Sequence, residues 1–179
     1  MANLIQEQQK TTFDTLKGDF GWKNVMQVPR LEKVTISVGV GKLTKDKQKL
    51  TLVADRLAKI TGQKAVKRGA KKAIATYKTR VGDHVGYQIT LRGARAHDFI
   101  NRLVHIALPR TKDFKGIPSN SIDEMGNYTL GIREHIVFPE TAEEELKDVF
   151  GMAITVGTTA KSQKEARAYL AHLGFPFKK

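Results

Sequence analysis

The residues with the clearest chemical potential are the cations of residues 56–82, which read RLAKITGQKAVKRGAKKAIATYKTRVG. This stretch contains nine Lys or Arg and no Asp or Glu. Like charges repel one another, so such a segment is not expected to stay compact without an anion to neutralise it. We therefore predict a flexible basic finger loop over residues 63–82 that becomes ordered on a polyanion such as RNA. A solvated charged loop is the simpler alternative.

The composition supports a nucleic-acid partner over most other classes. The chain has 179 residues, a net charge of +13 and a pI near 10.0, a balance that favours nucleic acid or an anionic membrane surface. No apolar run reaches the roughly 18 residues that a membrane-spanning helix needs, and residues 1–10 lack the pattern of a secretion signal. We expect a cytoplasmic protein with a single domain over residues 1–179.

Enzyme chemistry finds little support. The absence of cysteine removes disulfides, thiolate metal sites and cysteine nucleophiles, and no two of the five histidines have the short spacing of a metal-ligand pair. The turn around Gly41 and Lys42 fails the phosphate-loop pattern, because Ile36 and Leu43 occupy positions that require Gly and Ser or Thr. We expect no enzymatic activity, cofactor, metal site or small-molecule substrate. Two alternatives stay open: an enzyme acting on nucleic acid, testable by a metal-dependent nuclease assay, and, more weakly, a membrane-surface protein.

Hydrophobic periodicity predicts an α+β fold: a mostly antiparallel sheet of four or five strands, with helices packed on one face and a long basic loop. Strands are expected at residues 33–40, 85–92, 128–132, 134–138 and 152–158. Helices are expected at residues 3–17, 46–61, 94–107 and from Ser162 to Gly174. Gly18 and Gly62 are the expected ends of the first two helices, and Ser162 with Glu165 has the spacing of a capping box.

The strand faces that alternation directs away from the core share a chemical character. Their residues are small, hydroxylated, amide-bearing or basic: Lys33, Thr35, Ser37, Gly39, Gly86, Gln88, Thr90, Arg92, Thr129, Gly131 and Thr155. Hydroxyl and amide groups bind phosphates and ribose 2′-hydroxyls, although threonine also suits any exposed strand. The face has no aromatic residues for base stacking, so we expect docking onto folded RNA by shape and backbone contacts.

One segment has the opposite charge. Residues 121–150 contain eight acids against Arg133 and Lys147, a net charge of −6. A polyanion avoids such a segment, so it faces either water or a second, basic partner.

Six stretches together resemble the bacterial-type large-subunit ribosomal protein five, the 5S rRNA-binding ribosomal protein family. They are MQVPRLEKVTISVGVG (26–41), LAKITGQKAVKRGAKKAIATYKTRVG (57–82), ITLRGARAHDFINRLVHIALPR (89–110), DFKGI (113–117), GNYTLGIREHIVFPE (126–140) and GMAITVGTTAKSQKEARAYLAHLGFPF (151–177). The resemblance covers nearly the whole chain.

The resemblance implies a structural constituent of the large ribosomal subunit that binds 5S rRNA and helps to seat it in the central protuberance. It also implies contacts with the adjacent large-subunit rRNA, with P-site tRNA, and with a basic protein of the small-subunit head, which the acidic segment suits. The residues that it implies for 5S rRNA are Lys33, Ser37, Gln63, Lys64, Thr90 and Arg92. Those that it implies for tRNA are Lys71, Lys72, Tyr77, Lys78 and Arg80.

The chain departs from the family pattern at three positions. Ser37 stands where the family usually has Asn, Val81 replaces an expected acid, and Ala65 replaces an expected proline. Serine is shorter than asparagine and lacks its amide, which changes what position 37 can bind.

Overall fold

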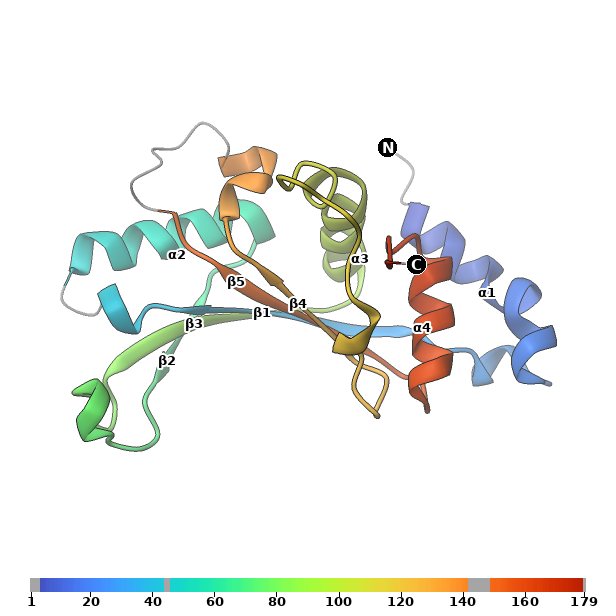
Figure 1. The fold of residues 1–179 in the computed structure, drawn as a ribbon, viewed down its shortest axis with the longest axis horizontal. Helices are drawn as coiled ribbons and strands as arrows, with labels where there is room; N and C mark the ends of the chain where they lie inside the picture. Colours follow the sequence, from blue (N-terminus) through green and yellow to red (C-terminus); the bar gives the residue numbers. More distant parts are fainter. Residues whose placement is uncertain (1–3, 44–45, 142–148, 179) are drawn as a thin grey trace. The chain divides into compact units, whose positions relative to one another are not determined.

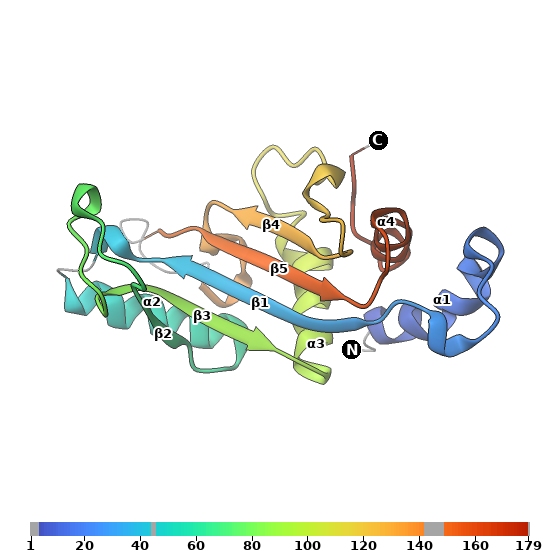
Figure 2. The ribbon, with the colours of Figure 1, turned by 90° about the horizontal axis from the view of Figure 1, so that it is seen from below.

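The computed structural model describes residues 4–43, 46–141 and 149–178. The strands of this part of the chain form a five-stranded antiparallel sheet in the order β2-β3-β1-β5-β4 (Figures 1 and 2). The strands are β1 (Leu31–Gly39), β2 (Val66–Gly69), β3 (His84–Leu91), β4 (Tyr128–Ile132) and β5 (Met152–Thr158). The α-helices are α1 (Leu4–Phe20), α2 (Lys47–Thr61), α3 (Ala94–Arg102) and α4 (Gln163–His172). The predicted α+β class is confirmed.

The chain divides into two compact units, each built from non-contiguous segments. Unit 1 comprises Met1–Val34, Leu91–Leu130 and Thr155–Lys179. Unit 2 comprises Thr35–Thr90 and Gly131–Ile154.

The core of unit 2 forms between its strands and α2. Ile36 and Val38 of β1 and Ile89 of β3 are at most 2 % exposed, and so are Leu57 and Ile60 of α2. These residues follow the strict alternation and the helical spacing that the sequence predicts. The helix ends as expected, since Gly62 has a left-handed φ of 68° that costs glycine no strain.

Gly86 corrects one prediction, because it is buried rather than outward-facing. An added Cβ would lie 2.9 Å from the carbonyl oxygen of Val38 on the neighbouring strand. We expect Gly86→Ala to lower the free energy of unfolding by about 1–3 kcal/mol, because the two backbones would have to separate. Urea denaturation measures the change. Gly39→Ala is the matched control, because the space around its Cβ position is open to 4 Å; equal losses in both variants would contradict this explanation.

Unit 1 is built on three helices. Ile5 of α1, Phe99 and Ile100 of α3, and Tyr169 and Leu170 of α4 are all 0 % exposed. The α3 stripe continues into a wider helical turn over Leu103–Ala107, and the buried residues of α3 and this turn are those that the sequence predicts.

The helix ends of unit 1 confirm one prediction and overturn another. Ser162 accepts a hydrogen bond from the Glu165 backbone N–H at 3.3 Å, as the capping-box spacing predicts. Gly18, in contrast, does not end α1, which continues to Phe20. The left-handed residue that ends the helix is Gly21, with φ of 64°, and its N–H donates to the Lys17 carbonyl at 3.0 Å. A glycine that keeps helical angles does not stop a helix.

The predicted strand at residues 134–138 is also wrong. His135–Val137 form a 3-10 turn, and the sheet neighbour of β4 is β5. The carbonyl of His135 accepts from the Phe138 N–H at 3.1 Å and from the Thr141 hydroxyl at 3.1 Å. Pro139 has no N–H to donate to a strand ladder. Local turns therefore use the groups that a strand would need.

Candidate nucleic-acid interface

Part of the predicted basic loop is a strand. Residues 66–69 form β2, which pairs antiparallel with β3 from Val66 opposite Gln88 to Gly69 opposite His84. The Arg68 Nε donates to the Gln88 side-chain oxygen at 2.6 Å across the pair. The expectation of a continuous loop over residues 63–82 is therefore wrong. All four residues of β2 are exposed, so the strand lacks the apolar alternation by which strands are recognised.

The end of the hairpin, which we call the fingertip (residues 70–83), is closed by backbone hydrogen bonds. Ala70 donates to the Asp83 carbonyl at 2.8 Å. Ile74 and Thr79 exchange two bonds of 3.2 and 3.3 Å around a short 3-10 turn. The Asp83 carboxylate also accepts from the Arg80 backbone N–H at 2.7 Å. These bonds hold a compact turn without a bound anion, contrary to the argument from charge repulsion.

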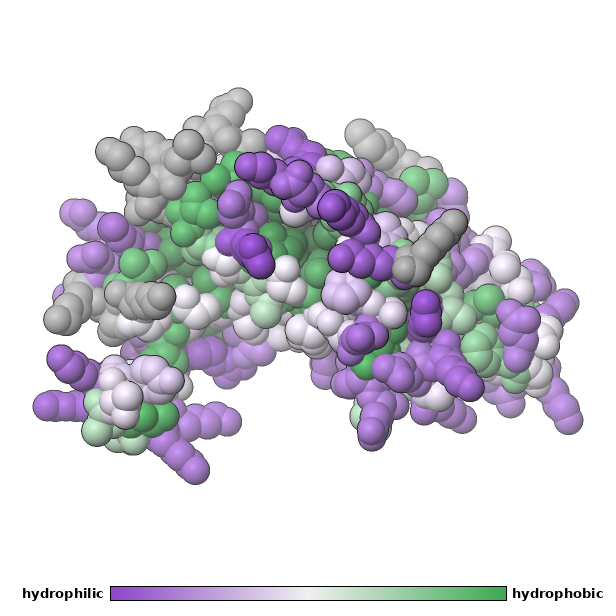
Figure 3. Space-filling model, viewed as in Figure 1, coloured by the Kyte–Doolittle hydropathy of each residue, from purple (hydrophilic) through white to green (hydrophobic). Residues whose placement is uncertain are grey.

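The surface of the fingertip combines cations with apolar groups. Tyr77 is 75 % exposed and Val81 69 %, with Ile74 also exposed. In Figure 3 the fingertip, which Figure 1 places between β2 and β3, shows a hydrophobic centre from which hydrophilic side chains radiate. The five residues that the resemblance implies for tRNA are all exposed here: Lys71, Lys72, Tyr77, Lys78 and Arg80. The structure thus brings these five together on one hairpin end.

Four of the residues implied for 5S rRNA lie in unit 2. Ser37 on β1, Thr90 on β3 and Lys64 after α2 are exposed, and Gln63 is half-buried. The Gln63 amide nitrogen donates to the Thr90 carbonyl at 3.3 Å. This bond leaves the Gln63 amide oxygen and the Thr90 hydroxyl as hydrogen-bonding groups beside each other.

The other two, Lys33 and Arg92, lie in unit 1 beside an acid. A Glu32 carboxylate oxygen lies 3.4 Å from Arg92 Nη1 and 3.9 Å from Lys33 Nζ. The sequence analysis found no acid on the outward strand faces and overlooked Glu32 at the start of β1. Exposed ion pairs of this kind contribute at most about 1 kcal/mol. An RNA phosphate can therefore displace Glu32 at small cost.

Unit 2 also contains a buried polar pair that sequence reasoning missed. Arg56 of α2 is 4 % exposed and its Nη1 lies 3.4 Å from Nε2 of His135, which is 0 % exposed. The His135 ring stacks on Phe150 at 4.1 Å, and Nδ1 faces the Phe150 N–H at 3.3 Å. Both ring nitrogens therefore face donors, which leaves no acceptor for a second ring proton. An arginine within a helical stripe is expected to be exposed, so no sequence signal marked this pair.

This pair predicts a loss of stability in acid. Burial, and secondarily the positive charge of Arg56, lowers the pKa of His135 from 6.5 to about 4, while the backbone bond with Phe150 opposes the shift more weakly. The unfolded chain then binds one more proton than the native chain between pH 6.5 and 4. Stability is therefore complete above pH 6.5 and falls as the pH drops, by about 2 kcal/mol. Urea titrations at pH 7 and 4.5 measure this loss, which should shrink in His135→Gln; an unchanged loss would refute the assignment.

The acidic segment is only partly described. Glu143, Glu144, Glu145 and Asp148 lie outside the described residues. Asp123 accepts two hydrogen bonds from Asn127, at 2.6 Å from its backbone N–H and 2.9 Å from its amide, and so stabilises the turn before β4.

Two kinds of site are absent from the part of the chain that the structure describes. In residues 4–43, 46–141 and 149–178, no group of three or more His, Cys, Asp or Glu is placed to hold a metal ion. None of the helices in these ranges is both long and apolar enough to cross a membrane.

Comparisons with known proteins agree with one another. The family model of Ribosomal protein L5 matches residues 24–80, and the ribosomal L5 family C-terminus matches residues 84–177. Three curated relatives carry the name large ribosomal subunit protein uL5. The Flavobacterium johnsoniae protein is 48 % identical over 98 % of this chain and 96 % of its own length. The Ureaplasma urealyticum protein is 49 % identical over 100 % and 97 %, and that of Trichlorobacter lovleyi 43 % over 99 % of both.

These matches span both units and extend along almost the whole length of each relative. They also agree with the resemblance that the sequence motifs carry. The chain therefore belongs to the ribosomal protein L5 family, the non-enzymatic structural proteins of the large ribosomal subunit that interact with rRNA.

Proposed function

We propose that the whole chain, residues 1–179, acts as one rRNA-binding domain that binds 5S rRNA and helps to attach it in the central protuberance of the large subunit. The observation that carries this proposal is the exposed cluster of Ser37, Gln63 and Thr90, in which hydroxyl and amide groups stand on or beside β1 and β3. Groups held on strands have fixed positions, which suits recognition of a folded RNA backbone and its 2′-hydroxyls. Lys64 lies next to this cluster, and Lys33 and Arg92 add cations in unit 1.

The fingertip is the proposed contact with P-site tRNA. Its exposed cations suit phosphates, and Tyr77 offers a ring on which a base or ribose can pack. Because the fingertip is already closed by its own hydrogen bonds, less ordering entropy is lost on binding than in a flexible loop.

The acids of residues 121–150 are the proposed contact with a basic protein of the small-subunit head, which would form an inter-subunit bridge. The net charge of −6 in this segment supports the assignment, since an acidic surface attracts a basic partner and repels RNA.

A filter-binding titration tests the proposal directly. Purified protein is titrated against 5S rRNA, a scrambled RNA of equal length and tRNA, at several salt concentrations. We expect 5S rRNA to bind far more tightly than the scrambled RNA even at high salt, because salt weakens phosphate contacts by a slope of about 0.7–0.9 per phosphate but spares shape recognition. Equal binding of all three RNAs, abolished by salt, would reduce the protein to a non-specific polyanion binder.

A further inference from the structure

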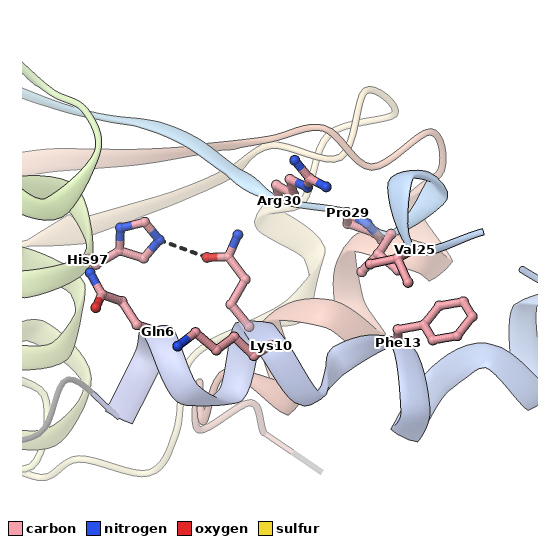
Figure 4. Close-up of a pocket in the computed structure, with 9 residues that line it drawn as sticks. Gln6, Lys10, Phe13, Val25, Pro29, Arg30 and His97 are labelled. Atoms are coloured by element: carbon pink, nitrogen blue, oxygen red, sulfur yellow. Dashed lines mark hydrogen bonds between the residues drawn. The ribbon is translucent and has the colours of Figure 1, made fainter.

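Unit 1 contains a groove that neither RNA contact proposed above uses. It lies along α1 and has a volume of about 490 Å³ (Figure 4). Its lining, which we call the α1 groove, consists of Gln6, Gln9, Lys10, Phe13, Val25, Val28, Pro29, Arg30 and His97. These residues come from α1, from the segment before β1 and from α3, so helix packing within unit 1 shapes the groove.

The two ends of the α1 groove differ in chemistry. Figure 4 shows Phe13, Val25 and Pro29 at one end and His97, Gln6 and Lys10 towards the other, with Arg30 across from α1. Val25 is 54 % exposed although it is apolar. An exposed apolar surface inside a concave site commonly marks a binding site.

The charge of the lining is entirely positive. Lys10 and Arg30 are both exposed, and none of the nine lining residues is acidic. The Arg30 side chain is steadied by its Nη2 lying 2.9 Å from the Met26 sulfur, and its backbone N–H donates to the Thr159 hydroxyl at 2.9 Å. The groove therefore suits an anion that also carries an apolar face.

The polar end is held in place by its own hydrogen bonds. His97 Nδ1 lies 2.8 Å from the Gly93 carbonyl oxygen, and Nε2 lies 2.7 Å from the Gln9 side-chain oxygen. This arrangement leaves the N–H donors of the Gln9 amide for a ligand. Fixed amide donors recognise the carbonyl edge of a base or a ribose hydroxyl.

We propose that the α1 groove binds one unstacked nucleotide of ribosomal RNA, with its base against Phe13, Val25 and Pro29 and its phosphate between Lys10 and Arg30. A nucleotide combines the flat apolar face, polar edge and negative charge that the two ends and the rim of the groove match. An acidic peptide would satisfy only the rim. The proposal rests on the rRNA-binding role of the family and does not depend on which RNA the strands or the fingertip bind.

The test uses the full-length ¹⁵N-labelled protein and four nucleoside 5′-monophosphates, followed by NMR. We expect at least one monophosphate to shift the resonances of Gln9 and His97 saturably at millimolar concentration, and its nucleoside to bind at least fivefold more weakly. Lys10→Ala and Arg30→Ala should each weaken the monophosphate about 3- to 10-fold, and Phe13→Ala should weaken nucleoside and monophosphate alike. Lys23→Ala is the matched control, since it removes an exposed cation outside the lining and should change affinity less than twofold.

Three outcomes would overturn the proposal. They are no saturable shift with any monophosphate, equal binding of inorganic phosphate or a tetraglutamate peptide, and equal losses in Lys23→Ala. Thermal unfolding of each variant separates loss of binding from loss of fold, and Phe13→Leu, which keeps an apolar side chain, should retain the fold if Phe13→Ala does not. Filter binding of the same variants to 5S rRNA reports separately on the strand contacts, so either result can fail without the other.

Discussion

We expect the triple variant Lys71→Ala, Lys72→Ala, Lys78→Ala to bind tRNA about 10- to 100-fold more weakly at 0.1 M salt. All three lysines are exposed on the fingertip, and each phosphate that they no longer neutralise removes about 0.7–0.9 from the salt slope. The slope should therefore fall by about 2–3. Filter binding across a salt series measures both quantities, and the affinity for 5S rRNA should change little.

The matched control removes the same number of charges from the same unit. Lys47, Lys49 and Lys59 are exposed on α2, so their replacement by alanine lowers the net charge equally without touching the fingertip. If both variants lose tRNA affinity equally, net charge rather than the fingertip determines binding. If the fingertip variant loses 5S rRNA affinity as strongly as tRNA affinity, the proposed division of roles is wrong.

The second large effect is expected at Arg92. Arg92→Glu should weaken 5S rRNA binding about 10- to 100-fold, because it removes a phosphate contact and places a second carboxylate beside Glu32. Glu32→Gln should act in the opposite direction and strengthen binding about twofold, since Arg92 then has no acid to leave. Thr90→Ala should reduce discrimination between 5S rRNA and the scrambled RNA.

Arg167→Glu controls for the reversal of charge. Arg167 is exposed on α4 in the same unit and belongs to neither proposed contact. A loss in this variant equal to that in Arg92→Glu would show a general electrostatic effect. Unchanged binding in both Arg92→Glu and Thr90→Ala would remove the 5S rRNA assignment from β3 and its end.

Sequence periodicity predicted the elements whose burial is one-sided. Val34, Ile36 and Val38 alternate with polar residues because one face of β1 packs on the core, and their exposed fractions of 0–2 % confirm this pattern. Helix α4 was predicted with its cap because Ser162 and Glu165 are local signals, satisfied within one turn.

The missed features depend on partners that are distant in the chain. Strand β2 is exposed on both faces, so only its pairing with β3 defines it. Gly86 is buried because Val38 of another strand approaches it, and Arg56 is buried beside His135, 79 residues away. For the candidate interface, the sequence supplied the residue types, whereas the nearby Glu32 carboxylate and the closed form of the fingertip required coordinates.

The discontinuous make-up of unit 1 has a consequence for the order in which the chain matures. His172 Nε2 lies 2.8 Å from the Gln8 carbonyl oxygen, a contact between residues 164 positions apart. At a synthesis rate of about 5–20 residues per second, α1 emerges on the order of ten seconds or more before the α4 residues that it packs against. The first helix to be made is thus among the last to complete its packing. A chain halted before α4 would leave that surface of α1 exposed, where chaperones and proteases act on nascent proteins.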